Sequence, residues 1–354
     1  MKVGFAIIGC GMISRYHAAA VRAVERARLV GVYAEDYASA GRMAAETGTR
    51  CYSSFREIWE DEQVSAVSIC VPSGLHARIA LEALEHGKHV LIEKPMALTL
   101  DDCDRLIEAG EKYNRKVCVV SQLRFSPDVA RAKRLVGEGA LGRLVSVGLY
   151  MKYYRSQEYY DASPWRGTWD MDGGGALMNQ GIHGVDLVQY IAGPVSSVYA
   201  CSATLSRRIE TEDTLSAVLQ FENGALGVIE AATSVYPGYP RRIELCGDKG
   251  TLTLEEDRIV RLEMEDGGSA PAKQPKTEEQ KAGASHRNAA ELDTQGHICQ
   301  VADLVSSILD GTPLLVDGRE GRKAVELVLG AYRSASLGLP VELSSAPEPR
   351  FSER

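Results

Sequence analysis

Short apolar runs alternate with amphipathic stretches along the first third of the chain. The runs have the length of β-strands and fall at residues 3–8, 29–33, 66–71, 89–92 and 117–120. Apolar positions with helical spacing occupy residues 12–25, 38–46, 77–85 and 100–113 between them. This alternation predicts a doubly wound parallel sheet with helices on both faces. The strands are apolar throughout because both faces of such a sheet are covered.

The pattern changes after about residue 125, where strands with alternating apolar and polar positions dominate. A helix predicted at 128–136 leads to a strand at 144–152, and further strands are predicted at 195–204, 214–221, 225–234, 242–246, 251–254 and 259–262. The turns Asn223-Gly224 and Asp248-Lys249-Gly250 join some of them, which favours a large, mostly antiparallel open sheet.

Two features follow this sheet. Residues 266–290 are polar and predict an exposed loop, and helices at 293–309 and 319–336 are predicted to pack back on the first domain. The chain is therefore predicted to be an α/β protein of two domains, a doubly wound domain over 1–124 and an α+β domain over 125–354. Its 354 residues are enough for a separate core in each.

Composition narrows the class of protein. Apolar residues make up 45% and charged residues 25% of the chain, which disfavours disordered and fibrous classes. The net charge of −8 argues against a nucleic-acid partner, and no apolar run has the length of a membrane span. Met1-Lys2-Val3 leads directly into the first strand, so we expect no signal peptide and a cytoplasmic location. The eight cysteines lack Cys-x-x-Cys pairs and metal-ligand spacing, which predicts reduced thiols and no metal site.

The first strand ends in Gly9-Cys10-Gly11-Met12-Ile13-Ser14, immediately before the first predicted helix. In this place Gly9 can form a tight turn, and Gly11 lets a pyrophosphate approach the main chain. The amides of Met12 and Ile13 then lie at the positive end of the helix. Ser14 replaces a third glycine, and its hydroxyl can meet a phosphate. A Rossmann-type dinucleotide site is the favoured interpretation, and a plain strand-to-helix turn is the alternative.

Acidic residues after the second strand indicate which dinucleotide is bound. An acid is expected there, about 20 residues after the glycines, to accept hydrogen bonds from the adenosine ribose. Ala34 occupies that position, and Glu35 and Asp36 follow it. Neither Arg nor Lys lies nearby to bind a 2′-phosphate. The sequence therefore predicts NAD rather than NADP, with Glu35 as a cofactor-binding residue.

Several motifs occur in one order along nearly the whole chain. They are the Gly9/Gly11 turn, Val71-Pro72-Ser73-Gly74-Leu75-His76, Glu93-Lys94-Pro95-Met96-Ala97, Gln122-Leu123-Arg124-Phe125, Gly173-Gly174-Gly175, Gly181-Ile182-His183 with Asp186, and Glu212-Asp213-Thr214. In this order and spacing the chain resembles the glucose–fructose oxidoreductase, inositol dehydrogenase and rhizopine-catabolism (Gfo/Idh/MocA) superfamily. The resemblance implies a Rossmann domain that binds NAD and a second domain that binds substrate and forms oligomers.

The resemblance also implies catalytic roles for Lys94 and His183, beside the substrate hydroxyl and the nicotinamide. Pro72, His76, Glu93 and Lys94 are implied to contact the cofactor. Asn179 stands where many members carry Asp, and an amide cannot act as a base. Acid–base work is therefore expected of Lys94 and His183.

Gly173-Gly174-Gly175 precedes a stretch predicted to be a helix. Asn179 and His183 are four residues apart and lie on one face of it. A buried, hydrogen-bonded histidine is the alternative to a catalytic one.

Substrate contacts are predicted for Arg124, Asn179, Lys94 and His183, and for Tyr153, Trp165 and Arg166 in a Tyr/Arg-rich loop. The alternative for this loop is packing on its own domain.

The leading hypothesis is an NAD-dependent oxidoreductase that transfers hydride from a secondary ring hydroxyl of a sugar, glycoside, nucleotide sugar or inositol. Members with the Asn-Gln-Gly-Ile-His form resemble sugar 3-dehydrogenases, so C3 of a pyranose is favoured. One alternative is a glycosidase that oxidises C3 transiently, and another is a non-catalytic NAD-binding sensor. The expected partners are the carbohydrate and a second copy of the chain, in a homo-dimer or homo-tetramer formed through the open sheet, without nucleic acid or membrane.

Overall fold

The computed structural model describes residues 2–265, 267, 269–270 and 294–343. The chain forms two compact units. The first comprises Met1–Ser126, Thr168–Gly173 and Arg287–Val325, and the second comprises Pro127–Gly167, Gly174–His286 and Glu326–Arg354. Among the described helices, none is long and apolar enough to cross a membrane.

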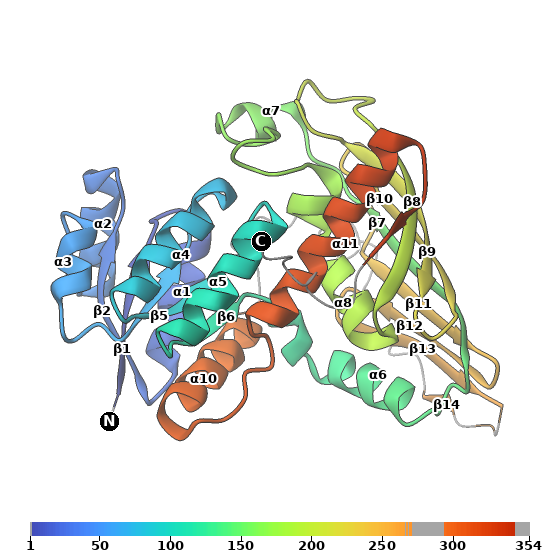
Figure 1. Ribbon diagram of the computed structural model, residues 1–354, viewed down its shortest axis with the longest axis horizontal. Coiled ribbons are helices and arrows are strands. Elements are labelled where there is room, and N and C mark those ends of the chain that lie inside the picture. The colour runs from blue at the N-terminus through green and yellow to red at the C-terminus, as the bar shows by residue number, and fades with distance from the viewer. Residues whose placement is uncertain (1, 266, 268, 271–293, 344–354) are drawn as a thin grey trace, which may run out of the picture. The chain divides into compact units, whose positions relative to one another are not determined.

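The first unit is built on a six-stranded parallel sheet with the order β3-β2-β1-β4-β5-β6. This is the strand order of a Rossmann fold. Its strands β1, β2, β5 and β6 are labelled in Figure 1. Its elements are β1 (Val3–Ile8), α1 (Met12–Ala23), β2 (Ala27–Tyr33), α2 (Tyr37–Thr47), β3 (Arg50–Cys51), α3 (Phe55–Glu60), β4 (Ala66–Ile69), η1 (Ser73–Leu75), α4 (His76–Glu85), β5 (His89–Ile92), α5 (Leu100–Lys112), β6 (Val117–Val119), η2 (Gln122–Phe125) and α10 (Gln295–Asp310).

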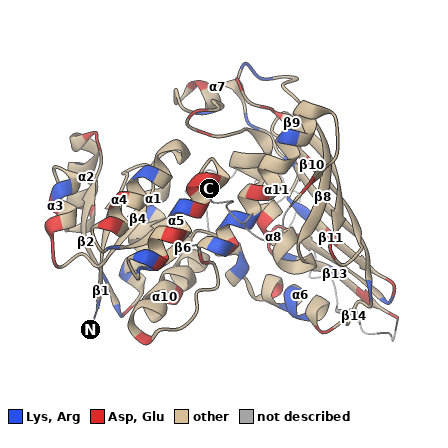
Figure 2. Ribbon diagram, in the orientation of Figure 1, with Lys and Arg blue, Asp and Glu red and all other residues tan. Residues whose placement is uncertain are grey.

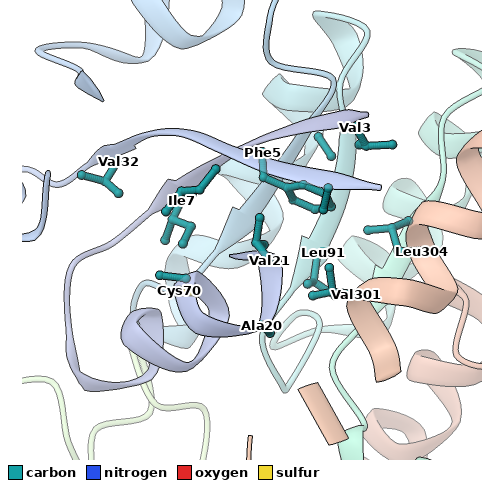
Figure 3. Packing of buried hydrophobic residues seen from close by; sticks show 14 of the residues in the cluster. Val3, Phe5, Ile7, Ala20, Val21, Val32, Cys70, Leu91, Val301 and Leu304 are labelled. Carbon is teal, nitrogen blue, oxygen red and sulfur yellow. The ribbon is translucent and has the colours of Figure 1, made fainter. Parts of the chain in front are cut away.

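The core of the first unit explains why its strands are apolar on both faces. Every residue of β1 is buried. Phe5 and Ile7 belong to one cluster with Val21 of α1 and with Val301 and Leu304 of α10 (Figure 3). Burial of apolar area of this kind stabilises a fold by about 25 cal/mol per Å². Phe5 and Ile7 point to one face of the sheet, so α1 and α10, which contact each other and are distant in sequence, cover that face together. Ala6 and Ile8, on the opposite face, are fully buried as well.

The second unit is built on a nine-stranded sheet with the order β14-β13-β12-β11-β7-β10-β9-β8-β15. Its pairs are antiparallel except for β10 and β7, which are parallel. Its elements are α6 (Pro127–Gly137), β7 (Leu144–Lys152), α7 (Gln157–Asp161), η3 (Ala176–Gly181), α8 (Ile182–Ala192), β8 (Val195–Ala203), β9 (Thr214–Phe221), β10 (Leu226–Ala232), β11 (Arg242–Gly247), β12 (Gly250–Glu255), β13 (Arg258–Met264), β14 (Ser269–Ala270) and β15 (Val341–Glu342). Helix α11 (Gly318–Leu337) begins in the first unit and ends in the second.

The predicted fold class, a parallel Rossmann sheet plus a mostly antiparallel sheet, is confirmed. The short elements β3, α3, α7, β14 and β15 were not predicted, because they are too short to show a period. The stretch after the triple glycine, predicted as a helix, begins with a π-helix at Ala176–Gly181. The exposed loop predicted at 266–290 lies almost entirely outside the described residues.

Charge is mixed along the surface helices. Figure 2 shows basic and acidic positions interspersed along α3 and α5. Opposite charges on these helices are paired locally, as in the bond between Arg56 and Glu60 one turn apart. These helices therefore lack the single-sign field that favours a nucleic-acid partner.

Candidate active site

The turn between β1 and α1 has the geometry of a phosphate-binding turn. Gly9 has a φ of +100°, and a Cβ there would lie 2.3 Å from the carbonyl oxygen of Cys70. A Cβ at Gly11 would meet nothing within 4 Å, so the space beside it is open to a ligand. Gly11 is also the N-cap of α1 and brings no side chain to the amides of the first turn. The turn therefore fits the pyrophosphate of a dinucleotide.

Ser14, which replaces a third glycine, is turned inward. Its side chain is fully buried, and Oγ donates to the carbonyl oxygen of Gly11 at 2.5 Å. The prediction that this hydroxyl meets a phosphate is wrong, because its proton is already bonded to the main chain of the turn. Ser14 instead holds the turn in shape from the interior.

The two acidic residues after β2 have different environments. Asp36 is the N-cap of α2, and its carboxylate accepts bonds from the Ser39 hydroxyl and from the Ala38 amide. The Ser39 bond is the main cause that lowers the pKa of Asp36. Glu35 is exposed at the end of β2 and remains the predicted ligand of the ribose.

Lys94 follows β5 at the carboxyl edge of the parallel sheet, the edge at which the glycine turn also lies. The main chain of Lys94 and Pro95 is held by two side chains. The Lys94 amide donates to Oε2 of Glu93 at 3.2 Å, and Nδ1 of His76 lies 2.7 Å from the carbonyl oxygen of Pro95. The Lys94–Pro95 peptide bond is cis. The predicted catalytic lysine is thus attached to a tightly bonded segment.

His76 is almost fully buried, and Nε2 lies 2.9 Å from the carbonyl oxygen of Val71. Burial lowers the pKa of His76, so its neutral ring has one N–H for the two carbonyl oxygens beside it. Its side chain therefore braces the Val71 and Pro95 segments, and its contact with the cofactor stays a prediction.

The Glu93 side chain points into the interior of the first unit. Oε1 lies 2.8 Å from Nε2 of His17, and Nδ1 of His17 lies 2.7 Å from Oγ of Ser68. The Glu93 carboxylate is thus occupied by His17 and the Lys94 amide. The predicted contact of Glu93 with the cofactor stays a prediction.

Charges in this interior cluster follow from the pKa shifts. Burial opposes charge on both Glu93 and His17, but their mutual contact prevails and lowers the pKa of Glu93 well below its usual range. The neighbouring Cys70 is the largest cause that raises the pKa of His17, and with the contribution of Glu93 this pKa reaches about 10. Burial and the charge of His17 lower the pKa of His297 to about 4. At neutral pH the cluster is therefore an ion pair beside a neutral histidine.

His17, Glu93 and His297 are also residue types that bind metals, and their ligand atoms lie within 4.8 Å of one another. Both ring nitrogens of His297 are shielded and lack a hydrogen-bond partner in the described part of the chain. His17 and Glu93, however, are bonded directly to each other, and the second nitrogen of His17 faces Ser68. This geometry is that of a hydrogen-bonded ion pair, and the expectation of no metal stays a prediction.

In the second unit, the triple-glycine run leads into the π-helix η3 and then into α8. The amides of Asn179 and Gln180 both point to the carbonyl oxygen of Gly175, at 3.2 and 3.4 Å, and the second of these is the i to i+5 contact of a π-turn. Asn179 Oδ1 accepts a bond from Gln180 Nε2 at 2.6 Å. His183 is half-buried in the first turn of α8. Single π-turns are often found at functional sites.

The Tyr/Arg-rich loop makes many contacts within its own unit. The Arg166 guanidinium lies 4.2 Å from the ring centre of Tyr159 and 5.5 Å from that of Trp165, and Nη1 donates to the Tyr159 carbonyl oxygen at 2.7 Å. Burial raises the pKa of Tyr153 to about 12. These contacts match the packing alternative, and substrate binding by Tyr153, Trp165 and Arg166 stays a prediction.

Arg124 is buried in η2 and forms an ion pair of 2.8 Å with Glu320 of α11, both in the first unit. Its predicted contact with substrate also stays a prediction. Lys94 belongs to the first unit, whereas Asn179 and His183 belong to the second. The predicted pairing of Lys94 and His183 around a substrate hydroxyl therefore stays a prediction.

Two residues that sequence reasoning did not assign to the site bind the start of η3. Glu212 is buried and bonds to the amides of Gly175 and Leu177, and the Tyr332 hydroxyl accepts a bond from the Met178 amide. Glu212 was visible only as part of the Glu212-Asp213-Thr214 motif. Tyr332 lies within the amphipathic pattern of α11, which carries no signal of this contact.

Comparison with known proteins agrees with this architecture. Residues 3–121 match a family described as the oxidoreductase family with an NAD-binding Rossmann fold, and residues 129–253 match the GFO/IDH/MocA C-terminal domain. The chain is 26% identical over 345 residues to myo-inositol 2-dehydrogenase of Thermotoga maritima, covering 94% of this chain and 96% of that protein.

Solved structures show the same similarity over the full length. The WlbA dehydrogenase from Bordetella pertussis, in complex with NADH and UDP-GlcNAcA, is 33% identical with a TM-score of 0.86, covering 98% of this chain and 99% of that one. An aldose-aldose oxidoreductase from Caulobacter crescentus, complexed with glycerol, is 27% identical with a TM-score of 0.82, covering 97% and 100%. This chain therefore belongs to the Gfo/Idh/MocA oxidoreductase family, whose N-terminal domain is an NAD-binding Rossmann fold.

Proposed function

We propose that this protein is an NAD-dependent dehydrogenase that oxidises a secondary ring hydroxyl of a carbohydrate, with C3 of a pyranose in a nucleotide sugar as the favoured position. The observation that carries the proposal is the position of Lys94. It follows β5 at the same edge of the sheet as the glycine turn. Its amide is bonded to Glu93, and the carbonyl oxygen of the next residue, Pro95, is bonded to His76. A lysine held at this edge is suited to act on a substrate hydroxyl beside a bound dinucleotide.

The chemistry needs two transfers from the substrate. A hydride leaves the ring carbon, and a proton leaves its hydroxyl oxygen, so the alcohol becomes a ketone. NAD supplies the hydride acceptor when it is bound. Lys94 and His183 are the residues that we assign to the proton, since an imidazole titrates near neutral pH and a lysine Nζ can hold or release a proton. Asn179 is assigned to hold the hydroxyl, because its amide donates and accepts but cannot remove a proton.

Similarity to WlbA supports a nucleotide sugar as the substrate class. That protein was solved with NADH and UDP-GlcNAcA, and it is alike over nearly the whole of both chains. The preference for C3 rests on the sequence Asn179-Gln180-Gly181-Ile182-His183 and its resemblance to sugar 3-dehydrogenases. Inositol is the second substrate class, because a 26% identical relative is named myo-inositol 2-dehydrogenase.

The test is formation of NADH from NAD with a panel of carbohydrates. UDP-GlcNAcA, UDP-GlcNAc, methyl glucosides and myo-inositol are each incubated with protein and NAD, and absorbance at the NADH band is followed. We expect NADH to accumulate with a nucleotide sugar and not with the Lys94→Met variant. Product oxidised at another carbon, identified by NMR, would remove the preference for C3.

Two other outcomes contradict the proposal in different ways. Release of the aglycone from a glycoside without net NADH would identify the redox-neutral glycosidase. Tight NAD binding without turnover on the whole panel would instead favour the sensor.

A further inference from the structure

The start of η3 is capped by residues from two other segments of the second unit. The first four amides of a helix lack partners within the helix and must find them elsewhere. Here the Gly175 amide donates to Oε2 of Glu212 at 2.9 Å, and the Leu177 amide donates to Oε1 at 2.8 Å. The Ala176 amide donates to the main-chain oxygen of Glu212 at 3.0 Å.

The fourth amide completes the arrangement through a tyrosine. Met178 N–H donates to the Tyr332 hydroxyl at 3.1 Å, and this hydroxyl donates in turn to Oε1 of Glu212 at 2.8 Å. The four amides 175–178 are therefore bonded by one glutamate and one tyrosine, which we call the Glu212/Tyr332 cap. Tyr332 lies in α11, and Glu212 lies in the loop before β9.

This cap explains two of the three consecutive glycines. A Cβ at Gly175 would lie 1.9 Å from the Glu212 carbonyl oxygen, and one at Gly174 would lie 2.2 Å from the Tyr332 hydroxyl. Gly174 also has a φ of +154°. Any larger residue at either position pushes the cap away from the amides, so these glycines serve the close approach of Glu212 and Tyr332.

The chemical character of the cap makes it strong and rigid. A carboxylate that accepts main-chain amides at a helix start forms charge-assisted bonds and faces the positive end of the helix. Burial raises the pKa of Glu212, although the bonds from the amides and from Tyr332 lower it. Burial, together with the adjacent Glu212 carboxylate, raises the pKa of Tyr332 well above its usual value. The tyrosine hydroxyl therefore stays protonated and donates a hydrogen bond to Glu212.

We propose that Glu212 and Tyr332 are positioning residues that hold η3, and through it Asn179 and the start of α8 with His183, in the geometry that catalysis requires. The inference rests on the proposed function, because it states that the cap positions Asn179 and His183 for catalysis. Loss of one cap bond frees an amide of the π-turn, and a helix that relaxes to α spacing changes the direction of Asn179. A misplacement of about 1 Å at a reacting group can cost on the order of 10²-fold in rate.

The experiment compares Tyr332→Phe and Glu212→Gln with Ser334→Ala as a matched control. Ser334 lies on the same helix, is fully buried, and bonds to the Ala200 amide and the Leu339 carbonyl oxygen. All three variants lose buried hydrogen bonds, but only the first two touch η3. We expect kcat to fall about 10- to 100-fold in Tyr332→Phe and Glu212→Gln, with unchanged affinity for NAD. Ser334→Ala should lower Tm by a similar amount as these two variants but keep the wild-type kcat.

Hydrogen exchange separates this inference from the proposed function. Amide exchange of residues 175–181, followed by mass spectrometry without substrate, should accelerate in Tyr332→Phe and stay at the wild-type rate in Ser334→Ala. Unchanged exchange of this segment in Tyr332→Phe overturns the cap. Faster exchange with wild-type kcat, in an enzyme that is active on carbohydrate, overturns the positioning role. A wild-type protein without any turnover defeats the proposed function, while the exchange data still decide whether the cap exists.

Discussion

Lys94 and His183 are expected to share the proton of the substrate hydroxyl. Lys94→Met and His183→Ala should each lower kcat by about 10²- to 10⁴-fold, the usual contribution of acid–base catalysis, while NAD binding persists. If both act in one relay, the double variant loses far less than the product of the single losses. Asn179→Ala should raise KM more than it lowers kcat. Steady-state kinetics on all four variants checks this, and near-normal turnover of Lys94→Met would mean that the base lies elsewhere.

Gly11 is expected to admit the pyrophosphate, and the structure allows a clean test. A Cβ at this position meets nothing within 4 Å, so Gly11→Val should fold normally but fill the space that a phosphate needs. We expect loss of NAD binding in a fluorescence titration, with a circular dichroism spectrum like that of wild type. Gly41→Val, at another open glycine in α2, is the control and should bind NAD normally.

Glu35 is expected to select NAD over NADP. It is exposed at the end of β2, whereas Asp36 is engaged in capping α2. A carboxylate near the 2′ position repels a phosphate, so Glu35→Ser should narrow the difference in affinity between the two dinucleotides. Titration of wild type and variant with NAD and with NADP measures this difference in affinity. Equal affinities in the wild type would contradict the assignment.

At the scale of elements, His297 of α10 lies beside His17 of α1 and near Glu93, which follows β5, in the core of the first unit. Its pKa of about 4 lies below the ordinary 6.5, so the unfolded chain takes up its proton first as pH falls. Stability from this group is complete above pH 6.5 and is lost as pH falls to about 4, by roughly 3 kcal/mol. The His17–Glu93 pair affects stability in other pH ranges. The stability that Glu93 contributes is lost only as pH falls below its unfolded pKa near 4.5. The stability that His17 contributes is lost as pH rises from 6.5 to about 10.

His297→Leu should therefore flatten the fall in Tm between pH 6.5 and 4.5. It should not lower Tm at pH 7.5, because it removes two buried nitrogens that have no hydrogen-bond partner among the described residues. Thermal melts across this range measure the slope. His86→Leu, at an exposed histidine, is the control and should keep the wild-type slope. An unchanged slope in His297→Leu would show that His297 does not titrate in this window.

The elements also show where sequence patterns fail. Strands and helices with several periods, such as β7, β9 and α11, were predicted within one residue of their ends. The π-helix was not predicted as such. The amides at its start bond to Glu212 and Tyr332, which lie 35 or more residues away in sequence. Local propensity cannot encode a cap that only tertiary contacts provide.

At the scale of the whole molecule, the open face of the large sheet is expected to form the contact between subunits. Tyr199, Val218 and Val228 occupy paired positions on β8, β9 and β10, and all three are exposed apolar side chains. Val218→Asp should dissociate the oligomer, since burying an unpaired charge in an apolar interface is costly. Light scattering after gel filtration measures the mass. Leu205→Asp, at an exposed apolar residue outside the sheet, is the control and should leave the mass unchanged.

The sequence by itself determined the Rossmann sheet, the glycine turn and the family, because these depend on local periods and on residues that are close in the chain. Gly9, Gly11 and Lys94 mark the ends of β1 and β5 without any knowledge of packing. Only the tertiary structure decided what the buried polar groups do. It turned Ser14 inward, paired Glu93 with His17, and joined Glu212 to Tyr332 across 120 residues. Most buried polar side chains form hydrogen bonds, and the partner of each is fixed by packing rather than by sequence spacing.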